Sequence, residues 1–374
     1  MKQTSKSGAD ASSPMNFVLT IAVVLLAVAV PLGVLISAQV RGESSSKHAS
    51  AFSKNKVGAG QDTGMQAGDY RISGPFTHKN LTIFLIHGKN MMEGRSFLTL
   101  QEALEQKKAV VYETKSVNEL SIENRSDQDV YVQAGDIVKG GQQDRVLAVD
   151  LIVPPRSGRM PIAAFCVESG RWNKREGERA EVFSSAAEVV VTKDLKLAAK
   201  SAKSQGAVWE NVTVTQDKLS ENVGTRVNST VSESSLQLAV ENRQVQETAA
   251  GYTRALAGVV KGKDDVIGYV FAINGAVNSA DVYGSSELFK KLWPKLLKAN
   301  AIEAISELRK DQKFDPATAE NVRIFLAEAE SSKASEQAVT ARISLLTRED
   351  DKSILFETQD RIQKRWIHRN YIRK

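Results

Sequence analysis

The 374-residue sequence has few of the residues that build disulfide or metal centres. Cys166 is the single cysteine, which excludes an intrachain disulfide and a metal site with several thiolate ligands. The four histidines, at positions 48, 78, 87 and 368, are scattered and show no zinc-motif spacing. A metal bound by carboxylates stays open, but the sequence points to no metal site and to no particular cofactor.

Common catalytic motifs are also absent. There is no P-loop, no G-x-G-x-x-G, no G-x-S-x-G and no H-E-x-x-H, which removes the most easily recognised phosphate-binding, nucleophile-elbow and zinc-helix enzymes.

The formal charge is +6, but six of the 50 Lys and Arg residues lie in residues 361–374, where no acidic residue occurs. The rest of the chain is balanced, so we expect no nucleic-acid-binding face.

The most apolar segment is residues 17–38, FVLTIAVVLLAVAVPLGVLISA, which begins at Phe17 and ends at Ala38 without a charge. As a helix rising about 1.5 Å per residue, it is long enough to cross a bilayer. It therefore predicts a single transmembrane helix after a short tail, residues 1–16. A cleavable signal peptide is the alternative, although its apolar region is usually only about 7–15 residues long.

The membrane orientation rests on two opposed arguments. Arg41, Lys47, Lys54 and Lys56 outnumber the lysines before the apolar segment, which favours a cytoplasmic body. A single N-terminal anchor, however, commonly exports the chain that follows it, and we expect the extracytoplasmic side. Residues 39–68 are rich in Ser, Gly and Lys and predict a flexible stalk.

The folded body is predicted to begin at about residue 69 with closely spaced strands. Expected strands are residues 81–88, 110–114, 120–123, 130–133, 146–153, 162–167 and 266–273, and Thr99 to Glu102 forms a capping box that opens a short helix. Helical patterns follow at residues 194–205, 232–256 and 287–308, the last interrupted near Pro294. The expected fold is α+β, with a largely antiparallel sheet and helices after it.

Residues 309–374 are expected to form a C-terminal helix and short strands. Asp315 and Pro316 suggest a helix start, and strands are expected at residues 341–347, 353–357 and 365–372. The last strand is basic and aromatic. It is interpreted either as an edge strand kept soluble by its charge or as a patch that contacts anionic lipid.

Two polar segments beside apolar strands are the candidate site. In the first, GDIVKGGQQDR, the glycines suit a tight turn, and Gln142, Gln143, Asp144 and Arg145 precede a strand. An arginine fork and two amides can bind a small polar or anionic ligand. The alternative is a solvated turn in which Arg145 is ion-paired.

The second segment is CVESGRW, residues 166–172, at the end of another strand. Glu168, Arg171 and Trp172 are candidate ligand contacts, or Glu168 and Arg171 close the turn as a salt bridge under the indole. Cys166 is more simply a packed core residue than a nucleophile, because no histidine lies nearby in sequence. If the two flanking strands pair as a hairpin through residues 154–160, Arg145 and Glu168 meet.

The runs GGQQDR, CVESGRW and YGSSELFKKLWPKLL resemble the ARPP-1 family, the ARG and rhodanese-phosphatase-superfamily-associated protein domain. The resemblance spans about residues 70–305 and implies one α+β domain, taken as residues 69–308. It implies no particular activity. We expect a membrane-anchored binding module for a small polar or anionic ligand. The alternatives are a hydrolase-like enzyme for a nucleotide- or ADP-ribose-related substrate, a context that the family name suggests, and an assembly protein of the cell envelope.

Overall fold

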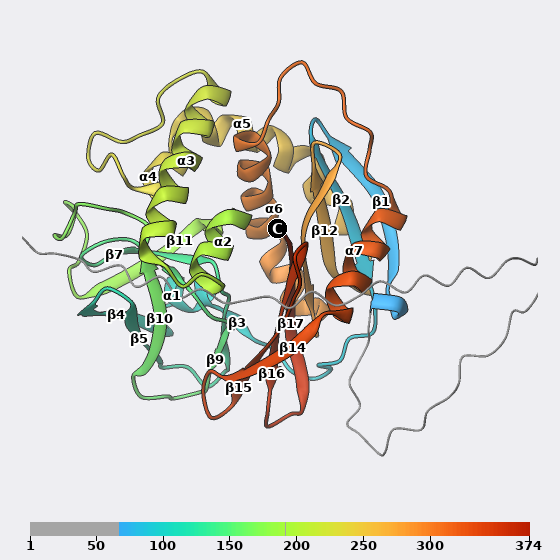
Figure 1. Cartoon of the computed structure of the whole chain (residues 1–374). Coiled ribbons are helices and arrows are strands. Elements are labelled where there is room, and N and C mark those ends of the chain that lie inside the picture. The colour runs from blue at the N-terminus through green and yellow to red at the C-terminus, as the bar shows by residue number, and fades with distance from the viewer. Residues whose placement is uncertain (1–66, 191) are drawn as a thin grey trace, which may run out of the picture. The chain divides into compact units, whose positions relative to one another are not determined.

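An eight-stranded antiparallel sheet is the largest element of the computed structural model, which describes residues 67–190 and 192–374 (Figure 1). The strand order is β1-β2-β12-β13-β17-β16-β15-β14. The strands are β1 Arg71–His78, β2 Leu81–His87, β12 Val266–Ile273, β13 Ala276–Tyr283, β14 Lys333–Ala338, β15 Ile343–Glu349, β16 Ser353–Asp360 and β17 Arg365–Arg373. The sheet thus joins segments from the start and the end of the folded chain.

Both faces of this sheet are covered, which explains why β2 is apolar at nearly every position. Leu81, Ile83 and Leu85 pack in the same cluster as helix α6, whereas Phe84 and Ile86 pack in the cluster of helix α7. Successive strand residues point to opposite faces, so a strand buried on both sides needs no polar alternation. The expected α+β fold with an antiparallel core is confirmed.

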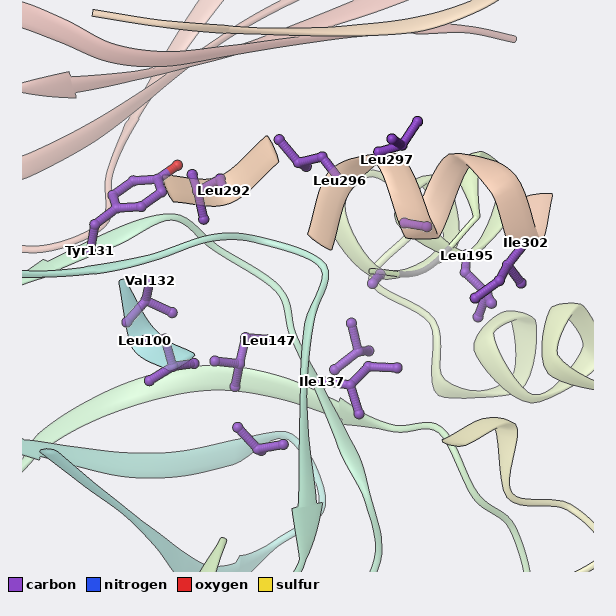
Figure 2. Close-up of a cluster of buried hydrophobic side chains, with 14 of the residues drawn as sticks. Leu100, Tyr131, Val132, Ile137, Leu147, Leu195, Leu292, Leu296, Leu297 and Ile302 are labelled. Carbon is purple, nitrogen blue, oxygen red and sulfur yellow. The ribbon is translucent and has the colours of Figure 1, made fainter. Parts of the chain in front are cut away.

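The second β unit is a closed six-stranded barrel in the order β10-β5-β4-β11-β7-β8. Its strands are β4 Ala109–Ser116, β5 Glu119–Asn124, β7 Asp136–Gly140, β8 Arg145–Leu147, β10 Met160–Cys166 and β11 Val182–Val190. A small sheet of β3 Leu98–Thr99, β6 Val130–Val132 and β9 Leu151–Val153 accompanies it. Figure 2 shows that α6 shares a buried cluster with residues from these strands, among them Ile137, Leu147 and Val132.

The helices are α1 Leu100–Glu105, α2 Lys193–Lys200, α3 Gln205–Val223, α4 Leu236–Val240, α5 Arg243–Leu256, α6 Ser286–Ser306 and α7 Ala319–Ser331, with 3-10 turns η1 Ala67–Asp69 and η2 Ala257–Val260. The capping box at Thr99 is confirmed. Three expectations were wrong in detail. The pattern over residues 232–256 is two helices, α6 continues through Pro294, and α7 begins after Thr318 rather than at Pro316.

A fully buried histidine connects the sheet to the segment between β8 and β9. His368 on β17 lies 2.8 Å from Asp150 through Nδ1 and 3.0 Å from Asp281 of β13 through Nε2. Burial alone lowers the pKa of His368, but the two carboxylates outweigh it and raise the pKa above its usual value. His368 therefore ties the C-terminal strand to β13 and to the segment between β8 and β9.

The interpretation of the C-terminal strand as an edge strand was wrong. β17 pairs with β13 on one side and with β16 on the other, and its residues 366–372 are buried. Of the basic residues in 361–374, Arg369 is buried against Glu357 at 2.6 Å and Arg373 is half-buried, while Arg361, Lys364, Arg365 and Lys374 are exposed. The domain boundary expected after residue 308 stays a prediction from the sequence.

The predicted tail and transmembrane segment, residues 1–38, and nearly all of the predicted stalk lie outside the described residues. Within the described ranges, no helix is both long enough and apolar enough to cross a membrane. Residues 67 and 68, at the end of the expected stalk, begin η1. The anchor and the stalk therefore stay predictions from the sequence.

Deleting residues 361–374 should abolish cooperative unfolding. The deletion removes the interior strand β17 and leaves the edges of its neighbours β13 and β16 unpaired. Circular dichroism and thermal melting of the truncated chain measure this. Lys364→Ala, a change at an exposed residue of the same segment, should leave the melting temperature nearly unchanged. An unchanged melting temperature after the deletion would contradict the interior position of β17.

Candidate functional site

Two turns meet at one end of the barrel. β8 pairs with β10 so that Arg145 lies opposite Cys166, and this places residues 140–145 beside the loop 167–178 that follows β10. We call these two segments, together with Glu113 of β4, the barrel mouth. The expected pairing is present, but it is no simple hairpin, because β9 between the two strands joins the small sheet instead.

The double glycine of the first turn is required by the backbone and by its neighbours. Gly140 and Gly141 have φ of 118° and 58°, values at which L-residues with a side chain are strained. A Cβ on Gly141 would lie 2.3 Å from the Phe183 ring and 2.9 Å from the Glu113 carboxylate. The turn therefore packs directly against both side chains.

Asp144 is a fully buried carboxylate at the centre of the barrel mouth. Its Oδ1 accepts from the Gly140 N–H at 3.0 Å and from the Arg175 guanidinium at 2.5 Å, and its Oδ2 accepts from the Ser235 hydroxyl at 3.2 Å. Arg175 also donates to Glu178 at 2.9 Å. These contacts fasten the first turn to the second loop and to the start of α4.

Glu168 closes the second turn. Arg171 donates to both of its oxygens, at 2.7 and 2.6 Å, and the Asp144 N–H donates to Oε2 at 3.2 Å. Burial raises the pKa of Glu168, but the hydrogen bonds and charge of Arg171 outweigh it, so that the pKa lies below its usual value. The carboxylate is thus ionised at neutral pH, and the expected Glu168–Arg171 salt bridge is present.

Arg145 is the largest fully buried side chain of the described residues. Its guanidinium donates to the Gln143 carbonyl at 2.7 Å and lies 3.5 Å from Glu113, while its Nε has no hydrogen-bond partner within the described chain. The Trp172 ring centroid lies 5.7 Å from the guanidinium carbon, and Trp172 is 44% exposed. The indole therefore lies between a buried cation and solvent.

The structure brings most of the predicted site residues together at the barrel mouth, where Asp144, Glu168 and Arg171 share one ion-pair network and Arg145 pairs with Glu113. Asp144, Arg145, Glu168, Arg171 and Trp172 meet at the barrel mouth, Gln143 is buried beside them, and Gln142 is half-buried and donates its N–H to Glu113 at 3.1 Å. The sequence analysis missed Glu113, Arg175, Glu178 and Ser235. Glu113 and Ser235 are distant in sequence, and Arg175 lies in a charged run that reads as solvated surface.

Cys166 belongs to the core. It is fully buried, and burial is the main cause that raises the pKa of its thiol to about 11. Its Sγ contacts the Val117 carbonyl oxygen at 3.9 Å. A neutral buried thiol is a poor nucleophile, which agrees with the interpretation of Cys166 as a packing residue.

A cleft of about 650 Å³ adjoins the barrel mouth. It lies against β4, β7 and β11, and Gly140 and Glu178 belong both to it and to the mouth. Four basic and two acidic side chains line it, namely Lys107, Arg125, Lys139, Arg179, Glu105 and Glu178, beside an apolar wall that includes Val110, Val182 and Phe183. Its volume is typical of small-molecule sites.

Within the described residues, no group of three or more His, Cys, Asp or Glu is arranged to hold a metal ion.

The site belongs to an α+β domain in which a barrel with a charged mouth accompanies a covered antiparallel sheet. A model of the ARG and Rhodanese-Phosphatase-superfamily-associated Protein domain, ARPP-1, matches residues 69–372, and the chain belongs to this family. No curated protein and no solved structure matches the chain.

Replacing Arg175 by Met should lower the free energy of unfolding by about 3–5 kcal/mol, because the buried Asp144 carboxylate loses its charged partner. Denaturant unfolding measures this loss. The control is Arg156→Met, which breaks the exposed pair with Asp127 and should leave stability nearly unchanged. Equal effects of the two substitutions would show that the barrel mouth is not held by its buried charges.

Proposed function

We propose that this domain is a binding module for a small anionic ligand that occupies the cleft beside the barrel mouth. The observation that carries the proposal is the excess of basic side chains in a cleft of suitable size. Lys107 and Arg179 are exposed and form no ion pair with a described residue, so their charge is available to a ligand. A carboxylate or phosphate is the natural partner of such groups.

The barrel mouth has a supporting part in this proposal. Of the predicted residues, Arg171 pairs with Asp144 and Glu168, and Arg145 contacts the Gln143 carbonyl and Glu113. Gly140 and Glu178 belong both to the barrel mouth and to the cleft wall. A ligand binds with higher affinity when the groups that contact it are already held in place before binding. The network thus supports a preformed cleft, and Trp172 and Gln142 are the predicted contacts that a ligand at the mouth reaches first.

The apolar wall favours a ligand that also has a flat or apolar part. Phe183 and Val182 of β11 and Val110 of β4 line the cleft together with its charged residues. A nucleotide combines an anionic group with a flat ring, which makes adenosine diphosphate a suitable probe. Inorganic phosphate tests the charged part of the cleft alone.

We propose further that residues 17–38 anchor the domain to a membrane, with the body on the extracytoplasmic side. The support is the uncharged apolar run of 22 residues. Contact with anionic lipid is a proposal for the exposed Arg361, Lys364, Arg365 and Lys374, because residues 366–372 are buried.

Adenosine diphosphate should raise the melting temperature of the protein, since a ligand at 100 times its Kd stabilises by about 2.7 kcal/mol. Arg179→Ala should remove most of this shift, because the substitution deletes an unpaired cation of the cleft. Thermal melting with increasing nucleotide or phosphate measures both. Lys333→Ala is the matched control, an exposed basic residue outside both the cleft and the barrel mouth, and should keep the shift. The same shift in Arg179→Ala as in the unsubstituted protein would place the ligand elsewhere.

The full chain should fractionate with membranes and resist extraction by high salt, whereas a chain that starts at Asp69 should stay in the supernatant. The reason is the apolar run between Phe17 and Ala38. Sedimentation and immunoblotting measure the distribution. Recovery of a mature chain that begins at Gln39 would replace the anchor by a cleaved signal peptide.

A further inference from the structure

A second constellation of reactive groups lies on the eight-stranded sheet, away from the barrel mouth. The Ser73 hydroxyl is 2.7 Å from Nε2 of His87, and Nδ1 of His87 is 2.9 Å from Oδ1 of Asp265. The histidine thus has a hydroxyl at one ring nitrogen and a carboxylate at the other. This is the order of contacts in a Ser-His-Asp nucleophilic centre.

The sheet register produces this arrangement. Ser73 of β1 pairs with Leu85 of β2, and His87 is two residues beyond Leu85, so Ser73 and His87 project from the same face as diagonal neighbours. Asp265 directly precedes β12, whose first residue, Val266, pairs with His87. Three segments that are distant in sequence therefore meet through regular strand pairing.

We propose that Ser73, His87 and Asp265 form a nucleophilic centre that cleaves small carboxylic esters. His87 is 4% exposed, so its ring is shielded, whereas Ser73 is half-buried and the next residues, Gly74 and Pro75, are exposed. The register shifts between Ser73 and Phe76, which takes Gly74 and Pro75 out of the regular pairing beside the nucleophile. An open surface of this kind suits a small acyl group rather than a long chain.

The reaction follows from the contacts. Ser73 Oγ attacks the ester carbonyl carbon while its proton passes to Nε2 of His87, and the imidazolium forms beside Asp265. The tetrahedral intermediate expels the alcohol, which takes the proton from His87 and leaves an acyl ester on Ser73. Water then attacks this ester, gives its proton to His87 and releases the carboxylic acid, with the proton returning to Ser73. The hydrogen bond from His87 is the main cause that lowers the pKa of Asp265, which keeps this carboxylate ionised.

Arg71 and Asp265 both contact Nδ1 of His87, and they favour different tautomers of its ring. The Arg71 guanidinium lies 2.6 Å from Oδ2 of Asp265 and 2.8 Å from Nδ1 of His87. A proton on Nδ1 suits Asp265 and leaves Nε2 free to accept the serine proton, whereas a hydrogen bond from Arg71 to Nδ1 would place the proton on Nε2. Arg71 therefore competes with Asp265 for Nδ1, and its removal should favour the reactive tautomer.

The test uses the full chain with p-nitrophenyl acetate and, separately, a fluorophosphonate probe. We expect a burst of p-nitrophenolate, a phosphonyl adduct mapped to Ser73 by mass spectrometry, and loss of both in Ser73→Ala. His87→Gln should slow the reaction by roughly 100-fold or more, since it removes the general base. Arg71→Ala should raise the rate, because it removes the competitor for Nδ1 of His87, whereas a purely structural role of the hydrogen bonds predicts a lower rate.

Ser335→Ala is the matched control, because Ser335 is an exposed strand serine that contacts no histidine of residues 67–374, and it should keep the full rate. Melting temperatures show whether each variant is folded. If Ser73→Ala does not fold, the position of the phosphonyl adduct in the unsubstituted protein decides whether Ser73 is the nucleophile. An adduct on another residue, no burst and no adduct, or an unchanged rate in folded Ser73→Ala or His87→Gln would overturn the proposal.

Discussion

The buried carboxylate of Asp144 is the interaction on which the organisation of the candidate site depends. A carboxyl group without solvent must be paired and hydrogen-bonded, because its desolvation is otherwise too costly. Burial is the main cause that raises the pKa of Asp144, and the charge of Arg175 opposes this effect. Arg175 and Ser235 satisfy this requirement from the loop after β10 and from the N-cap of α4, and the Gly140 N–H supplies the third contact. One side chain thereby fixes the barrel end, the loop and the first turn of a helix together.

Two of the three segments that carry the family resemblance lie at the end of the barrel that the contacts of Asp144 hold together. Residues 140–145 and 166–172 build the barrel mouth, and residues 283–297 contain the start of α6, which packs against both the sheet and the barrel cluster. The first two segments therefore have a structural explanation before any ligand is considered. The ligand proposal consequently depends on the neighbouring cleft, whose Lys107 and Arg179 are not used by the network.

Local features were predictable from the sequence, and long-range ones were not. The strand β2, the capping box at Thr99 and the pairing of β8 with β10 follow from apolar runs, cap residues and chain order. The interior position of β17 could not be foreseen, because β13 lies far upstream and the charged Arg369 resembles a surface residue until Glu357 of the adjacent strand is placed beside it. The sequence analysis likewise considered a solvated turn for Arg145, because its partner Glu113 is distant in sequence. In the structure, Glu113 and the Trp172 ring lie beside the buried guanidinium.

The most direct test of the central claim, that a preformed basic cleft binds an anion, is a crystal structure of the protein grown with selenate. Selenium scatters anomalously, so its position does not depend on interpreting weak density. The account predicts an anomalous peak in the cleft, in contact with Arg179 or Lys107, while the contacts of Asp144 with Arg175 remain as they are without the anion. An empty cleft with selenate bound elsewhere, or a peak at Asp144 with the ion pairs broken, would contradict it.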